Sequence, residues 1–229
     1  MAMLTGGAIL LGAVVVAFAL LSSGQVSSGE LTAPADPAPK ETWDGRALGP
    51  ASAPAVLSVY SDFQCPACDV FATKTEPQLI KDYVSAGKLR IVYKDFSFIG
   101  QESEDAAVAA RCAGDQGLFW PFHDYLFSNQ KGENKGAFNR ARLLQIARAV
   151  GVADEATFTS CLGTQAPLDG VKAETAEGQQ KGVESTPTLF LGDQKIVGVP
   201  AFTTLAAAID SVVSGSPAPS ASALPSATP

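Results

Sequence analysis

The sequence predicts an α/β domain that is interrupted by a long helical insertion. An apolar strand, a helix and a second strand follow one another in the first part of the chain, at 55–60, 66–85 and 89–93. From 102 to about 180 no convincing strand pattern appears, and apolar residues recur at helical spacing instead. Strand character returns only after this stretch, so the sheet must be completed by residues far from its first two strands.

The first three elements have clear local signals. Residues 55–60 form an apolar, β-branched run that is typical of a buried strand, and 89–93 (Leu-Arg-Ile-Val-Tyr) form a second one. The helix over 66–85 is expected to kink at Pro77 and to end at Gly87. A crossover of this length between two strands predicts that they pair in parallel.

The rest of the domain is predicted to consist of helical stretches, a hairpin and a final helix. The helical stretches are expected at 104–113, 119–128, 141–150, 155–162 and 168–181. Gly192-Asp193 is expected to be the turn between strands at 188–191 and 195–199, and a last helix should run over 202–213. This order places one all-helical insertion inside a single α/β unit.

The two ends of the 229-residue chain differ in composition from this body. The first 21 residues are apolar and free of charge, which predicts a membrane anchor, with a cleaved signal peptide as the alternative. Residues 22–42, rich in Ser, Gly, Ala and Pro, predict a flexible linker, and 215–229 predict a disordered tail. In either case the domain is expected outside the cytoplasm, where disulfides persist.

The overall composition excludes one class of partner. The net charge is −7 at pH 7, and the acidic residues are spread along the chain. Binding to nucleic acid needs a basic excess that neutralises phosphates, so the sequence argues against a nucleic-acid partner. With 46% hydrophobic residues the chain can bury a sizeable core.

Cys65-Pro66-Ala67-Cys68 is the strongest functional signal in the sequence. It follows the first strand and opens the first helix, where free N–H groups and the helix dipole favour a thiolate. A stabilised thiolate is a good leaving group, so a disulfide between these cysteines should exchange readily with other thiols. Half of a zinc site and a plain structural disulfide are the alternatives. Zinc takes about four ligands, whereas the chain has one histidine, His123, and no metal site is expected.

The chain resembles the DsbA-like thiol–disulfide oxidoreductases in three segments. They are 61–68 (Ser-Asp-Phe-Gln-Cys-Pro-Ala-Cys), 93–96 (Tyr-Lys-Asp-Phe) and 182–188 (Gly-Val-Glu-Ser-Thr-Pro-Thr). The resemblance implies a thioredoxin-like fold with an inserted all-helical domain, which agrees with the predicted order of elements. The thioredoxin-like domain would comprise 43–100 and 183–214, and the helical insertion 101–182.

The resemblance also implies roles for four residues. Cys65 and Cys68 would form the catalytic disulfide, in which a substrate thiolate attacks Cys65 and the more buried Cys68 is less reactive. Thr186 and Pro187 would bind substrate, with a cis peptide bond that leaves the Thr186 backbone free to pair with an extended chain. An ordinary trans proline at the start of a strand is the alternative for Pro187.

Further residues receive structural expectations. Cys112 and Cys161 both fall in the insertion, and since some relatives carry a second disulfide there, they are expected to form one. Closing a loop of this length contributes roughly 4 kcal/mol, and a pair of buried free thiols is the alternative. His123 lies on an aromatic helical face and is expected to be structural. Lys94 and Asp95 end a central strand, either near the active site or as a solvated charge pair.

One departure from the family concerns the residues between the two cysteines. Many members carry a histidine there that helps to stabilise the thiolate, whereas this chain has Pro66-Ala67. The disulfide is therefore expected to be less oxidising than that of the strongest members.

These features predict an extracytoplasmic thiol:disulfide oxidoreductase that oxidises cysteines of exported proteins. It would be a monomer on a single-pass anchor, would need no cofactor, and would be reoxidised by a membrane partner such as a quinone-linked enzyme. Secretion after signal cleavage is the alternative location. A disulfide isomerase or reductase of the same fold and a non-enzymatic metal-binding module that uses Cys65 and Cys68 are the alternative functions.

Overall fold

The computed structural model describes residues 29–216, and the described helices and strands lie within the unit that begins at Leu31. The expected anchor or signal at 1–21, the start of the linker and most of the tail fall outside this range. Within the described range, no helix combines the length and apolar character that crossing a membrane requires.

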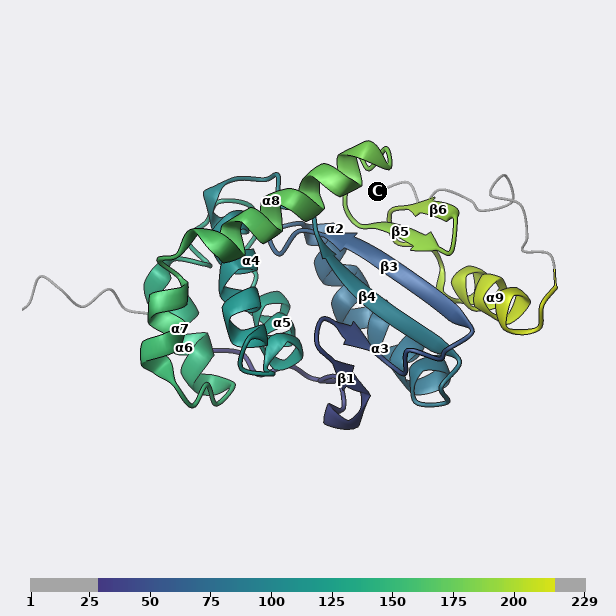
Figure 1. Cartoon of the computed structure of the whole chain (residues 1–229), viewed down its shortest axis with the longest axis horizontal. Helices are drawn as coiled ribbons and strands as arrows, with labels where there is room; N and C mark the ends of the chain where they lie inside the picture. Colours follow the sequence, from purple (N-terminus) through teal and green to yellow (C-terminus); the bar gives the residue numbers. More distant parts are fainter. Residues whose placement is uncertain (1–28, 217–229) are drawn as a thin grey trace, which may run out of the picture. The chain divides into compact units, whose positions relative to one another are not determined.

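The centre of the fold is a mixed sheet built around the parallel pair β3 and β4 (Figure 1). Its six strands are β1 (Trp43–Asp44), β2 (Ala47–Leu48), β3 (Ala55–Ser61), β4 (Leu89–Asp95), β5 (Thr188–Leu191) and β6 (Gln194–Val197). The order across the sheet is β1-β2-β4-β3-β5-β6, and the other pairings are antiparallel. The predicted parallel pairing is therefore confirmed, and the hairpin β5–β6 joins β3 although the whole insertion separates them in sequence.

The helical crossover from β3 to β4 is not a regular α-helix. It runs as α2 (Pro66–Val70), a π turn η2 (Phe71–Thr75), α3 (Glu76–Leu79) and a second π turn η3 (Ile80–Val84). Pro77 lacks an N–H, and its ring clashes with the carbonyl four residues earlier in a regular helix. The wider π turn before α3 accommodates it, so the irregularity expected at Pro77 appears as this turn.

The sequence did not predict β1, β2 or the short 3-10 turn η1 (Lys40–Thr42). Strand β2 pairs antiparallel with β4, with Ala47 opposite Val92. Strands of two residues are too short to display an alternating pattern. They form here because the edge of β4 offers unpaired backbone groups.

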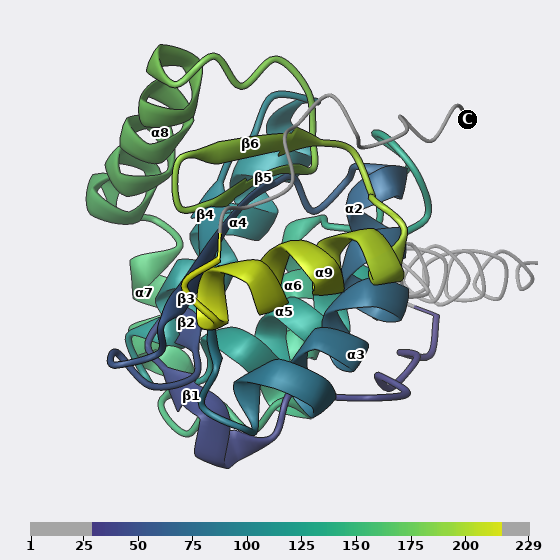
Figure 2. The same ribbon diagram turned by 90° about the vertical axis from the view of Figure 1, so that its right-hand side faces the viewer.

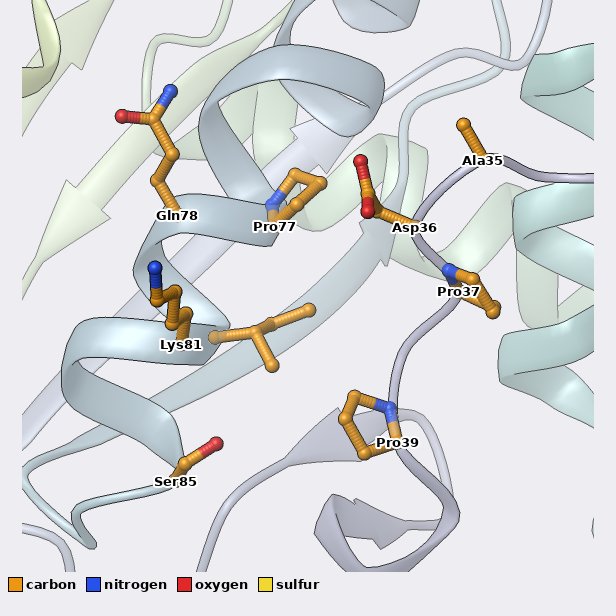
Figure 3. A pocket seen from close by; sticks show the side chains of 9 residues that line it. Ala35, Asp36, Pro37, Pro39, Pro77, Gln78, Lys81 and Ser85 are labelled. Carbon is orange, nitrogen blue, oxygen red and sulfur yellow. The ribbon is translucent and has the colours of Figure 1, made fainter.

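The linker expected over 22–42 differs from the structure in its second part, because residues 31–42 contact the domain. The Thr32 N–H donates to the Asn129 side chain at 2.9 Å, and the Ala38 N–H donates to Asp124 at 2.9 Å. Figure 3 shows Pro37 and Pro39 of this segment facing α3 and η3 across a cavity of about 640 Å³. Composition alone predicted flexibility, whereas side chains of a distant helix supply these partners.

The insertion consists of helices at the predicted positions. They are α4 (Gln101–Gly114), α5 (Phe119–Ser128), α6 (Arg140–Ala149), α7 (Glu155–Cys161) and α8 (Gln165–Gln180). A disulfide joins Cys112 in α4 to Cys161 at the end of α7, as the resemblance implied. The last helix, α9 (Phe202–Val213), has the bounds that the sequence predicted.

The two faces of the sheet pack against different helices (Figure 2). Leu57 and Val59 lie in the main core, which also contains residues of α2, α3 and α9. Tyr60 points to the opposite face, where its hydroxyl group donates to Glu177 of α8 at 2.9 Å. Gly178 of α8 allows this contact, since a Cβ there would lie 2.7 Å from the Phe96 ring.

Asp95, at the end of β4, is a buried ion-pair partner and not part of a solvated pair. Its carboxylate lies 2.9 Å from Arg46 and 2.6 Å from Arg111 of α4. Both arginines also pair with Glu174 of α8. The network joins the sheet edge to the helical insertion. Lys94 extends the network, because it pairs with Glu177 at 3.0 Å and lies 4.0 Å from Glu174.

Candidate active site

Cys65 lies at the N-terminus of α2, directly after the loop that follows β3. It has extended backbone geometry (φ −72°, ψ 122°) and is the N-cap residue, with Pro66 at the first helical position. Proline suits this position because its missing N–H would have no helical partner. The sequence therefore places the first thiol where the free N–H groups of the helix point.

The two thiols differ in burial and in acidity. Cys65 is 8% exposed and Cys68 is 1% exposed, and both are unbonded thiols in this structure. The pKa of Cys65 is lowered to about 6, mainly by a hydrogen bond from the Cys68 thiol, with smaller contributions from Thr186 and from the N–H groups of Cys68 and Ala67. Burial, and then the charge on Cys65, raise the pKa of Cys68 well above its ordinary value. Cys65 is thus the thiolate and Cys68 the protonated thiol at neutral pH.

The sheet brings the Thr-Pro motif onto Cys65. The pairing of Tyr60 with Thr188 places the residues before β5 beside the residues after β3. The Thr186–Pro187 peptide bond is cis, and the Cys65 sulfur lies 3.2 Å from the Thr186 carbonyl oxygen, to which the protonated thiol donates. The structure therefore joins the four residues that the resemblance singled out.

A buried carboxylate organises the loop before Cys65. Asp62 is fully buried and accepts hydrogen bonds from the Gln64 N–H at 2.8 Å and from the Ser103 hydroxyl at 2.6 Å. Its second oxygen accepts from the N–H groups of Phe98 and Ile99. Since a buried carboxylate needs such donors, Asp62 fixes the loop against the residues that follow β4.

The helical insertion also holds this loop, through residues that the sequence did not single out. The Gln130 side chain donates to the carbonyls of Phe63 at 2.8 Å and Cys65 at 3.1 Å. The Gln64 side chain donates to Ser103 and accepts from the Asn134 N–H. Isolated polar residues after a helix give no sequence signal, so only the fold reveals these contacts.

His123 lies outside this site, as expected for a structural residue. It is 2% exposed, and its ring lies among aromatic rings that include Phe63 and Tyr93. The Cys112–Cys161 disulfide lies within the insertion and uses neither active-site thiol. Among the described residues, the one group of three potential metal ligands does not include Cys65 or Cys68.

The sequence matches the thioredoxin family (Thioredoxin_4) over residues 41–211. It is 27% identical over 168 residues to a probable disulfide bond formation protein D of Bacillus anthracis, covering 72% of this chain and 76% of that protein. Disulfide bond formation protein D of Bacillus subtilis is 26% identical over 151 residues, which is 65% of this chain and 68% of that protein. The fold is similar to the crystal structure of oxidised BdbD from Bacillus subtilis, with a TM-score of 0.70, 22% identity, and coverage of 81% of this chain and 100% of that one.

Proposed function

The chain belongs to the thioredoxin family and is a DsbA-like thiol:disulfide oxidoreductase, and from this premise we propose that it oxidises cysteine pairs of exported proteins. The observation that carries the proposal is the difference in acidity between the two thiols. A Cys65 thiolate with a pKa of about 6 is stable at neutral pH. The reduced form of the pair is therefore favoured, which makes the disulfide form an oxidant.

The exchange proceeds in two balanced steps. A substrate thiolate attacks the Cys65 sulfur, a new S–S bond forms, and the Cys65–Cys68 bond breaks with its electron pair and a proton going to Cys68. A second substrate thiolate then attacks the substrate sulfur of this mixed disulfide, and Cys65 leaves as a thiolate. The substrate loses two electrons and gains a disulfide, while Cys65 and Cys68 are reduced.

Thr186 and Pro187 are proposed to bind the substrate chain beside Cys65. The carbonyl of Thr186 lies 3.2 Å from the sulfur that the substrate attacks. An extended segment of substrate can add to the Thr186 backbone beside this sulfur by main-chain hydrogen bonds.

The proposed location is outside the cytoplasm, on a single-pass anchor formed by the apolar residues at the start of the chain. Turnover requires that the reduced cysteine pair be oxidised again, and a quinone-linked membrane enzyme is the proposed partner. No further cofactor enters the exchange, and a monomer suffices because both thiols come from one chain.

Activity of three variants on a reduced, unfolded substrate protein tests the proposal. Cys65→Ser should abolish oxidation. Cys68→Ser, offered a substrate that carries a disulfide, should accumulate a mixed disulfide between Cys65 and the substrate, because the Cys68 thiol that would release it is absent. The double variant Cys112→Ala/Cys161→Ala is the control, because it removes cysteines that lie outside the site. Normal activity in Cys65→Ser would refute the role of Cys65 as the attacked sulfur. If the equilibrium with glutathione favoured the Cys65–Cys68 disulfide over the two thiols, the protein would act as a reductant.

A further inference from the structure

Three potential metal ligands converge in the interior, beneath the crossover helix. Glu76 comes from α3, and His123 and Asp124 come from α5. One ligand atom of each lies within 4.8 Å of the others. Glu76 and His123 are buried, at 3% and 2% exposure, so these groups meet in a medium of low dielectric constant. Neither Cys65 nor Cys68 belongs to this cluster.

The histidine ring is held in a fixed orientation. The imidazole ring packs against five aromatic side chains: Phe63, Tyr93, Phe119, Trp120 and Phe127. Nδ1 of His123 lies 2.9 Å from Oδ1 of Asp124. The second oxygen of Asp124 accepts the Ala38 N–H at 2.9 Å, which orients the carboxylate. Such supporting contacts are typical of residues that bind metal ions.

Glu76 is a buried carboxyl group that lies beside His123 and Asp124. Among the ion pairs of residues 29–216, none joins Glu76 to a lysine or an arginine, so no such side chain offsets a negative charge there. Burial raises its pKa to about 7, with His123 lowering the pKa and Asp124 raising it. Two carboxyl groups and one imidazole thus share an interior space that a cation would neutralise.

The cluster is connected to solvent on the side of Asp124. This residue is 12% exposed and lines a pocket of about 390 Å³ together with Asp36 and Asp69. The π turns η2 and η3 lie on either side of the short α3 that carries Glu76. Turns of this kind occur frequently at functional sites. Of the three residues in the cluster, Asp124 is the one that this pocket exposes, and Lys74 lines the pocket together with the carboxylates.

We propose that Glu76, His123 and Asp124 form a binding site for one divalent transition-metal ion, separate from the redox-active cysteines. One imidazole nitrogen with two carboxylates is a donor set for zinc or a similar ion, whereas calcium and magnesium prefer oxygen alone. A zinc site takes about four ligands, so one coordination position would remain for a water molecule.

Zinc titration of the full domain in its disulfide form tests the site, because oxidation removes Cys65 and Cys68 as competing ligands. Calorimetry should show one Zn²⁺ per chain. Loss of even a supporting group weakens metal binding by about 10- to 100-fold, so Glu76→Gln and His123→Phe should lose at least this much affinity. Both replacements keep the shape of the side chain. Asp69→Asn is the matched control in the same pocket, and its affinity should stay near that of the wild type.

A second measurement needs no variant. His123 is the sole histidine of the chain, so one set of imidazole resonances in a tag-free protein reports on the site directly. Zinc should shift the Nδ1 resonance strongly and at the stoichiometry found by calorimetry. Any of three results would overturn the proposal: no stoichiometric zinc binding, an imidazole resonance that zinc does not shift, or an unchanged zinc affinity in Glu76→Gln. The cluster would then hold a proton and no metal ion. None of these readouts depends on thiol exchange, so they are independent of the proposed oxidase activity.

Discussion

Replacing Cys68 with alanine should raise the pKa of Cys65. The largest cause of the low Cys65 pKa, about 6, is the hydrogen bond from the Cys68 thiol, and the N–H groups at the start of α2 contribute less. A hydrogen bond to a charged group contributes about 1.5–3 kcal/mol. Since one pKa unit corresponds to about 1.4 kcal/mol, the Cys65 pKa in the variant should lie at about 7–8.

The change has a large effect at neutral pH. At pH 7 a thiol with a pKa of about 6 is roughly 90% thiolate. In the variant this fraction should fall to roughly 10–50%, and alkylation of Cys65 by iodoacetamide should slow in proportion. The ultraviolet absorbance of the thiolate against pH gives the pKa directly.

Cys68→Ser is the matched control, because its hydroxyl group keeps a donor at the same position. Its Cys65 pKa should stay closer to 6 than that of Cys68→Ala. If Cys68→Ala titrated near 6 as well, the backbone N–H groups and not the second thiol would account for the acidity.

The same pKa predicts how the stability of the reduced protein depends on pH. The folded-state pKa of Cys65, about 6, lies below its ordinary value of 9.0. A lowered pKa contributes stability that is fully present above pH 9.0 and is lost as the pH falls through 6. The reduced protein should therefore lose stability on acidification across this range relative to the disulfide form, whose Cys65 does not titrate. Urea denaturation of both forms at several pH values measures the difference, and parallel pH curves would contradict the prediction.

Three further changes have defined outcomes. Gln130→Ala removes the donor that joins the insertion to the Cys65 carbonyl, so the Cys65 pKa and the rate of Cys65 alkylation should change. Gln130→Glu, which has no N–H donor, should not restore them. An unchanged Cys65 titration would show that Gln130 has no positioning role. The double change Cys112→Ala/Cys161→Ala opens a loop with a sequence separation of 49, so the free energy of unfolding should fall by about 4 kcal/mol in urea, with substrate oxidation near normal. Ala67→His places a cationic group beside the thiolate and should make the disulfide more oxidising in a glutathione equilibrium; a more reducing potential would count against this account.

The sequence alone determined most of the elements and the position of the redox-active pair. The bounds predicted for the helices at Phe119–Ser128 and Phe202–Val213 agree with the structure, and so does the strand Thr188–Leu191. These signals are local, since apolar spacing and Gly or Pro residues fix where an element begins and ends. The Cys65-Pro66-Ala67-Cys68 motif is local as well, because a strand, a turn and a helix start suffice to define it.

The surroundings of the motif were decided only by the tertiary structure. Thr186 reaches Cys65 because β5 pairs with β3, and Gln130 reaches it because the insertion folds back over the loop. In the same way Glu76 and His123 meet only when α3 packs near α5. Each of these contacts joins residues that are far apart in the sequence, and no local pattern encodes such a meeting. The chain thus specifies its reactive thiols and the main cause of their acidity locally, whereas the groups that position the thiols and those of the proposed metal site depend on packing.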